Sequence, residues 1–377
     1  MKKSGKEIEI TALFTRYNFL EKLFSFFTNN LLYLFHFFFH SRQSGEGILI
    51  VSLHLLGDTV YTIPAIRHLK RDFSNDRISI LCFPTGIKLY KLFFSDINIH
   101  TVTKSQFIYG RLAKNSVRKA IKVINPRIII DLTGAITSAS SIFLSGARLT
   151  GMNQHYYRKI YDDFTPLRTT PHLMEMYMDP IRKILKNPVD YSFFEFESNF
   201  KRIDKILIFP FAGWKAKEWS FEYFIEIARW LSKEYTVEFM AEPNQLSPKM
   251  TENLKNNRFK INYSSSLEEL FKLISECSLF ISNDSGPVHI AQAMGRAVFI
   301  IYGPSNPEYS IPFGNNYGFV RKLIDCSPIN QQFCLTLAGR KCPTIECMRD
   351  LSVETVREKL QIFLNKFETP NQSNEIS

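Results

Sequence analysis

The residues best suited to chemistry gather in one stretch, Leu279 to Pro304, where a carboxylate, a hydroxyl and an imidazole lie close together in the chain. Asn283-Asp284-Ser285-Gly286-Pro287 has turn chemistry, and His289 follows one turn into a helical pattern. The free N–H groups and positive dipole end of such a helix favour a phosphate. Asp284 is unexpected beside an anion unless it contacts hydroxyl groups. The alternative is that Asp284 and Ser285 only cap the helix.

The elements around this turn predict a parallel sheet. Leu279 to Ser282 is an apolar run typical of a strand buried on both faces. A helical pattern runs from Val288 to Met294, Gly295 ends it, and Ala297 to Tyr302 forms a second apolar run. A strand–turn–helix–strand unit of this kind places the turn at the carboxyl end of its strand, where open α/β sheets bind ligands.

The segment before this unit follows the same pattern. Lys205 to Phe209 predicts a strand, and Lys217 lies in the short segment that follows it. We also expect a helix over Phe221–Leu231 capped by Ser220, a strand over Val237–Met240, and a helix over Ser266–Ile274 with Ser266 and Glu269 spaced as a capping box.

The first half of the chain predicts a similar set of elements. Strands are expected over Gly47–Val51, Arg77–Phe83 and Arg127–Leu132, with helices through Ile63, Ile66 and Leu69 and over Val117–Ile124. Gly57-Asp58 forms a lone turn after the first strand, which is a weak signal by itself. No G-x-G-x-x-G or G-x-x-x-x-G-K-[ST] motif is present, so neither a dinucleotide fingerprint nor a P-loop is indicated.

The length of 377 residues favours two domains. Residues 187–204 contain Asn187-Pro188 and an aromatic-acidic patch, which is typical of a linker. We therefore expect an aromatic-rich segment over 1–43, a Rossmann-like domain over 44–190, a second over 203–350, and a C-terminal helix with a polar tail over 351–377.

The net charge of +11 indicates an anionic partner, such as a nucleotide, a phospholipid, an anionic glycolipid or a nucleic acid. The basic residues are scattered without a run of five, so no nucleic-acid partner is expected. Leu23–Phe27 and Leu31–Phe39 are apolar but far shorter than the roughly 20 residues that span a bilayer, and no cleavage site follows them. The segment fits the membrane interface, or an ordinary helix packed on the protein.

The six cysteines fall into two groups. Cys82 and Cys277 have apolar neighbours and are expected in the core. The other four crowd one polar segment with spacings that match no zinc template, so structural zinc, paired thiols and simple packing all remain open: Cys326, Cys334, Cys342 and Cys347. The chain has no D-x-D pair, so no metal-bridged diphosphate and no metal site are expected.

Four blocks in order resemble glycosyltransferase family 9, the heptosyltransferases of lipopolysaccharide core assembly: GDTVYTIPAI (57–66), FPFAGWKAKEW (209–219), SNDSGPVHIAQAMG (282–295) and CPTIECM (342–348). The resemblance spans residues 47–360. It implies an α/β protein of GT-B architecture, with two Rossmann-like domains facing across a cleft. It also implies inverting, metal-independent transfer from a nucleotide diphosphate sugar, ADP-heptose in the best-known members, without a cofactor. The acceptor would be a lipid-linked glycan at the inner face of the cytoplasmic membrane, where the enzyme would contact the membrane surface.

The resemblance also implies roles for individual residues. Asp58 matches the proposed general base, and Lys217 matches the lysine on the donor diphosphate. The other donor-binding matches are Asp284 on the sugar hydroxyls, Ser285, Gly286 and His289 at the diphosphate turn, and, more loosely, Glu242 on the ribose. Each has a plain alternative: a helix cap for Asp58, a solvated surface charge for Lys217, and a buried helix histidine for His289.

Two functions of different classes fit this pattern. One is a membrane-surface sugar transferase, and the other is a catalytically silent nucleotide-binding or assembly protein on the same fold. The chain keeps Asp58, Lys217, Asp284 and His289 together. An inert relative is expected to have lost at least one of them, so the pattern favours the enzyme.

Overall fold

The computed structural model describes residues 45–107, 115–198, 202–334 and 342–368, together with Phe27, Asn30, Leu31, Leu34 and Phe200. The chain divides into two compact units between Phe194 and Glu195, which lies inside the stretch predicted as a linker. Each unit contains one six-stranded sheet.

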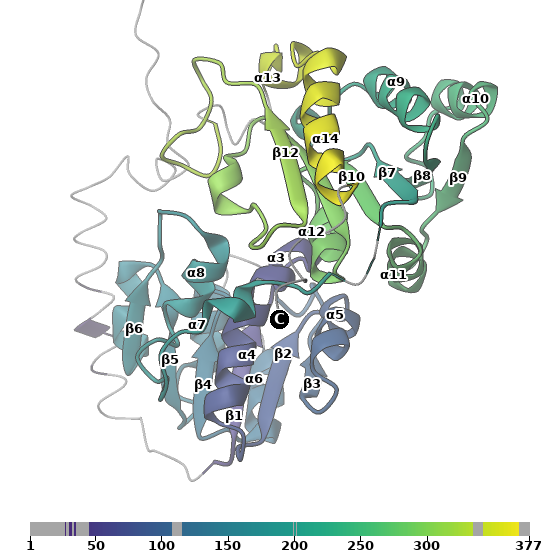
Figure 1. Cartoon of the computed structure of the whole chain (residues 1–377). Helices are drawn as coiled ribbons and strands as arrows, with labels where there is room; N and C mark the ends of the chain where they lie inside the picture. The colour runs from purple at the N-terminus through teal and green to yellow at the C-terminus, as the bar shows by residue number, and fades with distance from the viewer. Residues whose placement is uncertain are drawn as a thin grey trace, which may run out of the picture. The chain divides into compact units, whose positions relative to one another are not determined.

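The N-terminal unit alternates strands with helices, as Figure 1 shows. Its strands are β1 (Ile48–Ser52), β2 (Ile78–Cys82), β3 (Asn98–Thr101), β4 (Ile128–Asp131), β5 (Arg148–Asn153) and β6 (Asp163–Pro166). Its helices are α3 (Leu56–Tyr61), α4 (Ile63–Asp72), α5 (Gly86–Phe93), α6 (Asn115–Ile124), α7 (Ile136–Ile142) and α8 (Leu173–Met178), with short 3₁₀ turns η1 (His155–Ile160) and η2 (Tyr191–Phe194).

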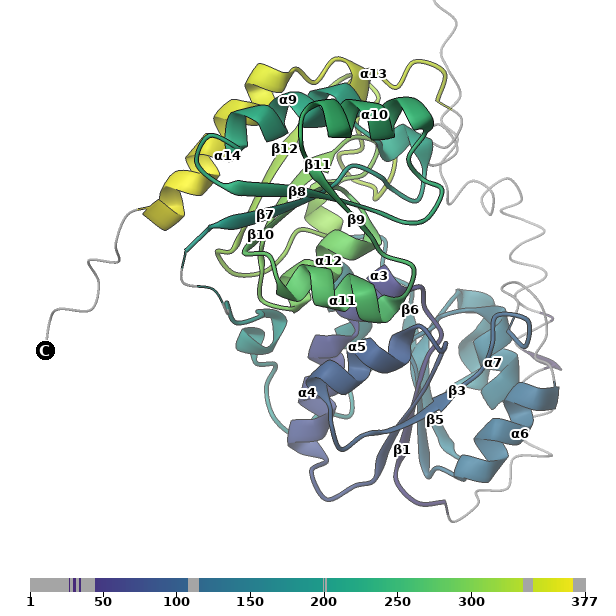
Figure 2. The same ribbon diagram turned by 90° about the vertical axis from the view of Figure 1, so that its right-hand side faces the viewer.

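The sheet of this unit has the order β3-β2-β1-β4-β5-β6 and is parallel throughout. This is the strand order of a Rossmann fold. Successive strands are added on one side of β1 up to β3 and on its other side from β4 onward, so the order of the strands reverses between β1 and β4. All five residues of β1 are buried, as expected for a strand covered on both faces. α6 and α7 cover one face, and α4 and α5 cover the other (Figure 2).

The C-terminal unit repeats the arrangement. Its strands are β7 (Lys205–Phe209), β8 (Thr236–Ala241), β9 (Lys260–Tyr263), β10 (Leu279–Asn283), β11 (Ala297–Tyr302) and β12 (Tyr317–Arg321). Its helices are α9 (Phe221–Leu231), α10 (Pro248–Asn256), α11 (Leu267–Ser275), α12 (Gly286–Ala293), α13 (Glu346–Arg349) and α14 (Val353–Glu368), with 3₁₀ turns η3 (Lys215–Lys217) and η4 (Pro307–Tyr309).

The second sheet, β12-β11-β10-β7-β8-β9, is again parallel and again has the Rossmann order, with its reversal between β7 and β10. α9, α10 and α14 lie over one face, and α11 and α12 over the other (Figure 2). The predicted α/β class with two Rossmann-like halves is therefore confirmed.

α14 belongs to the core of the C-terminal unit, although the sequence pattern placed residues 351–377 outside that domain. Leu360 and Phe363 are buried in the same cluster as Ile206 and Ile208 of β7. The helix approaches β12 closely because Gly318 has no side chain: a Cβ there would lie 2.8 Å from the ring of Phe363.

Two predicted helix starts differ in detail from the structure. Ser220 is the N-cap of α9, but its side chain makes no cap hydrogen bond and instead donates to Glu222 Oε2 at 2.8 Å. Ser266 does cap α11 by accepting from the N–H of Glu269. The Glu269 carboxylate accepts from the N–H of Ser265 rather than from Ser266, so the predicted capping box forms only in part.

Most of the predicted membrane-facing segment, residues 1–43, lies outside the described residues. Phe27, Asn30, Leu31 and Leu34 are helical, and the three apolar side chains are 62%, 57% and 51% exposed. Within the part of the chain that the structure describes, no helix combines the length and hydropathy needed to cross a membrane.

Candidate active site

Asp284 is the centre of the most connected group at the carboxyl edge of the C-terminal sheet. It follows directly after β10 and is 7% exposed. Its Oδ2 accepts from Lys217 Nζ at 2.6 Å and from Ser305 Oγ at 2.6 Å, and its Oδ1 accepts from His289 Nε2 at 3.1 Å. The structure thus brings together Lys217, Asp284 and His289, three of the residues predicted from the sequence.

The loop that carries Lys217 is held by the last residue of β10. Asn283 is fully buried, and its side chain accepts from the N–H of Trp219 at 3.0 Å and donates to the carbonyl of Pro210 at 2.8 Å. Both ends of the loop are therefore fixed to the strand that precedes Asp284. Because β7 and β10 are neighbours at the reversal of the sheet, Lys217 and Asp284 meet where Rossmann-like sheets bind ligands.

Lys217 is enclosed, so the interpretation as a solvated surface charge is wrong. Its side chain is 14% exposed, whereas that of Lys215 is 79% exposed. The ammonium lies 4.8 Å from the ring centre of Trp214 and 5.4 Å from that of Phe333. The contacts with two aromatic faces and one carboxylate fix the position of the charge.

Asp284 remains ionised in this setting. Burial by itself would raise the pKa of its carboxyl, but the Lys217 ammonium and the hydrogen bond from His289 outweigh burial and hold that pKa well below its usual range. A buried cation and a buried anion are therefore held ready at one sheet edge. Perturbed charges of this kind are characteristic of functional sites.

The interpretation of Asp284 and Ser285 as simple helix caps is not supported by their contacts. Ser285 occupies the N-cap position of α12, but it forms no side-chain cap hydrogen bond, and its Oγ lies 2.9 Å from Ser282 Oγ. Gly286 is the first residue of the helix, and Pro287, which lacks an N–H, follows it. His289 is buried, which agrees with its alternative interpretation as a buried helix histidine. Its ring also contacts Asp284, however.

Glu242 lies at the same sheet edge, one strand further along. It follows β8, the neighbour of β7, and its side chain is exposed. Its N–H donates to Gln245 Oε1 at 2.8 Å. The structure therefore places Glu242 near the end of a strand but not within the group around Asp284.

Asp58 belongs to the N-terminal unit. It is exposed and is the third residue of α3, whose N-cap position is taken by Leu55. Asp58 is thus a first-turn residue rather than the N-cap. α3 follows β1, the strand at the reversal of the first sheet, so Asp58 also lies near a carboxyl sheet edge.

The loop between β1 and α3 is anchored to the end of β4. The N–H of Leu53 donates to Thr133 Oγ1 at 3.0 Å, and His54 Nε2 lies 3.1 Å from the carbonyl of Leu132. Burial lowers the pKa of His54 to about 4, against the opposing effect of that carbonyl, so the ring is neutral at pH 7 and Nε2 donates. A fixed loop of this kind sets the position of the turn that bears Asp58.

The family model described as glycosyltransferase family 9 (heptosyltransferase) matches residues 116–337. That match covers all of β4 to β12, including the whole group around Asp284. The chain belongs to glycosyltransferase family 9.

Relatives of known sequence and structure agree with this. The chain is 25% identical over 344 residues to lipooligosaccharide heptosyltransferase 2 of Campylobacter jejuni, covering 85% of this chain and 99% of that protein. The crystal structure of the family 9 glycosyltransferase from Veillonella parvula has a TM-score of 0.69 at 18% identity, with 86% and 99% of the two chains covered. Escherichia coli heptosyltransferase WaaC with ADP-2-deoxy-2-fluoro heptose has a TM-score of 0.59 at 16% identity, with 84% and 99% covered. The fold is that of the GT-B glycosyltransferases, and the chain is a glycosyltransferase.

Three residues of this family 9 site were missed in the sequence: Trp214, Ser305 and Phe333. Trp214 lies inside the quoted FPFAGWKAKEW block, so its position beside Lys217 was the one available signal. Ser305 and Phe333 contact the site from segments that carry no local motif. Gly303 allows the Ser305 segment to pass close to α13, because a Cβ at that glycine would lie 2.4 Å from Met348 Sδ.

The four late cysteines of this glycosyltransferase line a single pocket with Ala216, Gly303 and Pro304, next to the site: Cys326, Cys334, Cys342 and Cys347. All six cysteines are free thiols, and the expected core positions of Cys82 and Cys277 are confirmed by their burial. No group of three or more histidine, cysteine or carboxylate side chains in the described part of the chain is arranged to hold a metal ion.

Proposed function

We propose that this family 9 enzyme transfers heptose from ADP-heptose to the growing core of a lipopolysaccharide or lipooligosaccharide. The observation that carries the proposal is the buried Lys217–Asp284–His289 group at the reversal of the C-terminal sheet. Support comes from the similarity to the Campylobacter lipooligosaccharide heptosyltransferase 2 and to WaaC, whose structure contains ADP-2-deoxy-2-fluoro heptose.

The donor would bind along the carboxyl ends of β7, β8 and β10. Lys217 and the first N–H groups of α12 are suited to the diphosphate, because both place positive charge at one point. Ser285, Gly286 and His289 would line the diphosphate turn, and Asp284 would accept from hydroxyl groups of the sugar. Glu242 would contact the ribose.

The chemical step would invert the anomeric carbon. An acceptor hydroxyl oxygen forms the new bond to that carbon while the bond to the diphosphate oxygen breaks. The electron pair leaves with ADP, and the hydroxyl proton passes to the carboxylate of Asp58. Lys217 stabilises the charge that develops on the departing diphosphate.

We further propose that transfer needs no metal ion or cofactor. The Lys217 ammonium and the N-terminus of α12 would neutralise the diphosphate in place of a divalent cation. Turnover should therefore be unchanged in excess EDTA. Loss of turnover in EDTA, restored by one particular divalent metal, would overturn this part.

The acceptor would be lipid-linked and reached at the inner face of the cytoplasmic membrane. Phe27, Leu31 and Leu34 have the spacing of one helix face and are exposed, and the chain carries a net charge of +11 that favours anionic head groups. In a flotation assay, the chain should associate with vesicles that contain phosphatidylglycerol and dissociate in high salt. Replacing these three residues by serine should abolish flotation, whereas Val123→Ser, at another exposed apolar position, should not. Equal flotation of both variants would contradict the membrane role of the segment.

The decisive experiment combines the purified enzyme with ADP-heptose, matched UDP and GDP sugars, and deacylated core acceptors with and without heptose. We expect transfer from ADP-heptose, and NMR of the product should show the anomeric configuration opposite to that of the donor. Transfer from another donor would change the substrate, and retention of configuration would refute the role of Asp58 as a base.

A further inference from the structure

Two segments on either side of β12 contact the two partners of the Lys217–Asp284 ion pair, and an isolated antiparallel bridge joins these segments. Ser305, 3% exposed, donates to Asp284 Oδ2. Phe333 stacks its ring near the Lys217 ammonium at 5.4 Å. Ser305 and Phe333 are themselves partners in an isolated antiparallel bridge.

The hydrogen bonds of this bridge fix where the two side chains point. The N–H of Asn306 donates to the carbonyl of Gln332 at 2.9 Å, and the N–H of Cys334 donates to that of Pro304 at 2.8 Å. These bonds flank Ser305 and Phe333, which makes them a non-hydrogen-bonded pair. In such a pair the two side chains lie on the same face and close together. The bridge therefore presents a hydroxyl and an aromatic face side by side.

We propose that Ser305 and Phe333 are positioning residues of the donor site, Ser305 for the carboxylate of Asp284 and Phe333, with Trp214, for the ammonium of Lys217. The inference rests on the proposed function, because it takes Asp284 to contact the sugar and Lys217 the diphosphate. The bridge sets the two contacts at a fixed spacing. The groups that contact the diphosphate and the sugar of one donor molecule are then correctly spaced before the donor binds.

The aromatic rings of this arrangement contact the Lys217 ammonium as well as filling space. The rings of Trp214 and Phe333 have centroids 4.9 Å apart with an angle of 49° between them. The Lys217 ammonium lies near both rings while it contacts Asp284, so the rings cover part of its surface and its side chain is only 14% exposed. An aliphatic side chain at position 333 would fill a similar space but would lack the negative ring face.

The two halves should give different binding signatures, measured by calorimetry with ADP and with ADP-heptose. Phe333→Leu should weaken ADP and ADP-heptose alike, by roughly three- to tenfold, because both ligands carry the diphosphate. Phe333→Tyr keeps the ring face and should bind as the wild type does. Trp214→Leu should repeat the effect of Phe333→Leu and serves as a second probe if that variant does not fold.

Ser305→Ala should leave ADP binding unchanged and weaken ADP-heptose by roughly tenfold, because only the sugar contacts the carboxylate that Ser305 holds. Ser305→Thr keeps the hydroxyl and should restore the affinity. Thermal unfolding of each variant checks that it is folded.

Unchanged affinities in Phe333→Leu, Trp214→Leu and Ser305→Ala would overturn the inference. An equal loss for both ligands in Ser305→Ala would also overturn it, because that would be general loosening of the two segments. Failure of the proposed function looks different: the wild-type enzyme would then not bind ADP, or would bind it without transferring heptose.

Discussion

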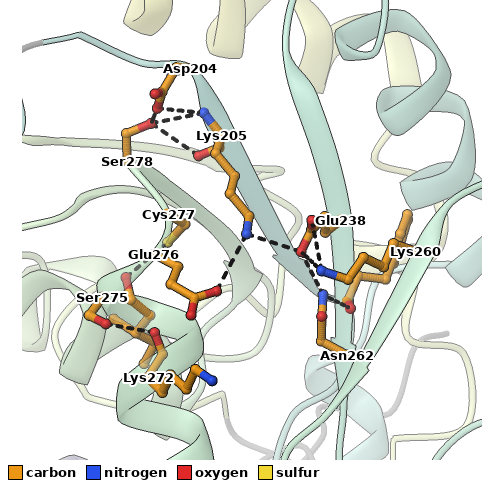
Figure 3. A network of polar contacts seen from close by, with 12 residues as sticks. Asp204, Lys205, Glu238, Lys260, Asn262, Lys272, Ser275, Glu276, Cys277 and Ser278 are labelled. Carbon is orange, nitrogen blue, oxygen red and sulfur yellow. Dashed lines mark hydrogen bonds and ion pairs between the residues drawn. The ribbon is translucent and has the colours of Figure 1, made fainter.

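Ion pairs lie at both ends of the strands in the C-terminal sheet, which we call its amino edge and its carboxyl edge. The two groups of ion pairs are built differently. At the amino edge, shown in Figure 3, Glu238 accepts from Asn262 at 2.8 Å and pairs with Lys205 and Lys260, each at 3.2 Å. Lys205 also reaches Glu276 at 3.6 Å. These residues lie on or beside β7, β8 and β9, and Glu238 and Lys260 are direct partners in the ladder.

At the carboxyl edge the pair comes from loops rather than from strand register. Lys217 and Asp284 follow β7 and β10, and their side chains are 14% and 9% exposed. Their contacts depend on the amide of Asn283, the hydroxyl of Ser305 and the aromatic rings around the ammonium.

The difference distinguishes charges that contribute to the stability of the sheet from charges that we propose bind the donor. Glu238 has several cationic or amide partners, and Lys260 keeps 62% of its side chain in solvent. The removal of any one partner therefore leaves no buried charge without a compensating contact. Lys217 and Asp284 are both desolvated, and burying such a pair often adds little net stability. We infer that the amino edge contributes to folding and that the carboxyl edges serve the reaction.

The largest effect is expected at the carboxyl edge of the N-terminal unit. Asp58→Asn removes the carboxylate that we propose takes the acceptor proton, so turnover should fall by roughly 10²-fold or more. ADP affinity, measured by calorimetry, should not change. Wild-type turnover in this variant would remove Asp58 from the mechanism.

The next effect concerns the buried cation. Lys217→Ala should weaken binding of ADP by roughly tenfold or more, because it removes the proposed charge-assisted contact with the diphosphate. Lys215→Ala is the matched control: this residue lies in the same turn but is 79% exposed, so its removal should leave ADP affinity nearly unchanged. Similar ADP affinities in the two variants would break the distinction between the buried and the exposed lysine.

A smaller effect, on stability alone, is expected for Glu238→Gln. Burial by itself would raise the pKa of Glu238, but bonds from Asn262, Lys260 and Lys205 outweigh it and leave that pKa lowered. The resulting stability is present above the unfolded pKa of about 4.5 and is lost as the pH falls through the lower folded pKa. Chemical denaturation should show a loss of about 1–2 kcal/mol at pH 7 that shrinks below pH about 4. Reduced ADP affinity in this variant would show that the two edges are not independent.

The smallest effect is expected for Lys260→Ala. Its ammonium is mostly solvated, so the free energy of unfolding should fall by less than about 1 kcal/mol, and turnover should not change. A loss as large as that of Glu238→Gln would mean that Lys260 alone carries the network.

Much of the fold could be predicted because its central strands are apolar throughout. β7 and β11 have the predicted bounds, and Gly295 ends α12 with a positive φ of 74°. The four edge strands, β3, β6, β9 and β12, were not predicted, because an edge strand is only partly covered and its sequence lacks the continuous apolar run. The internal strand β5 was also missed, because polar residues and a glycine interrupt its sequence. The predicted helix through Ile63, Ile66 and Leu69 is α4. Gly57-Asp58, predicted as a turn, instead lies inside the short helix α3.

The candidate site divides in the same way. Asp284 and His289 lie five residues apart in one motif, so their contact was accessible to sequence reasoning. The role of Lys217 was predicted only from the family resemblance. Phe333 could not be predicted, because its contact with Lys217 depends on a bridge between segments that are far apart in the chain.

The place of α14 has a consequence for the order in which the protein folds during synthesis. This helix completes the core of the C-terminal unit, yet it follows all six strands of that sheet in the chain. Until the ribosome has released Val353–Glu368, β12 lacks the helix that packs against it and the core of the unit is incomplete. The N-terminal unit is a separate compact unit that ends at Phe194, so it can fold while the rest is still being made. A nascent chain that stalls before α14 would therefore present one finished domain and one domain whose apolar core is exposed beside β12.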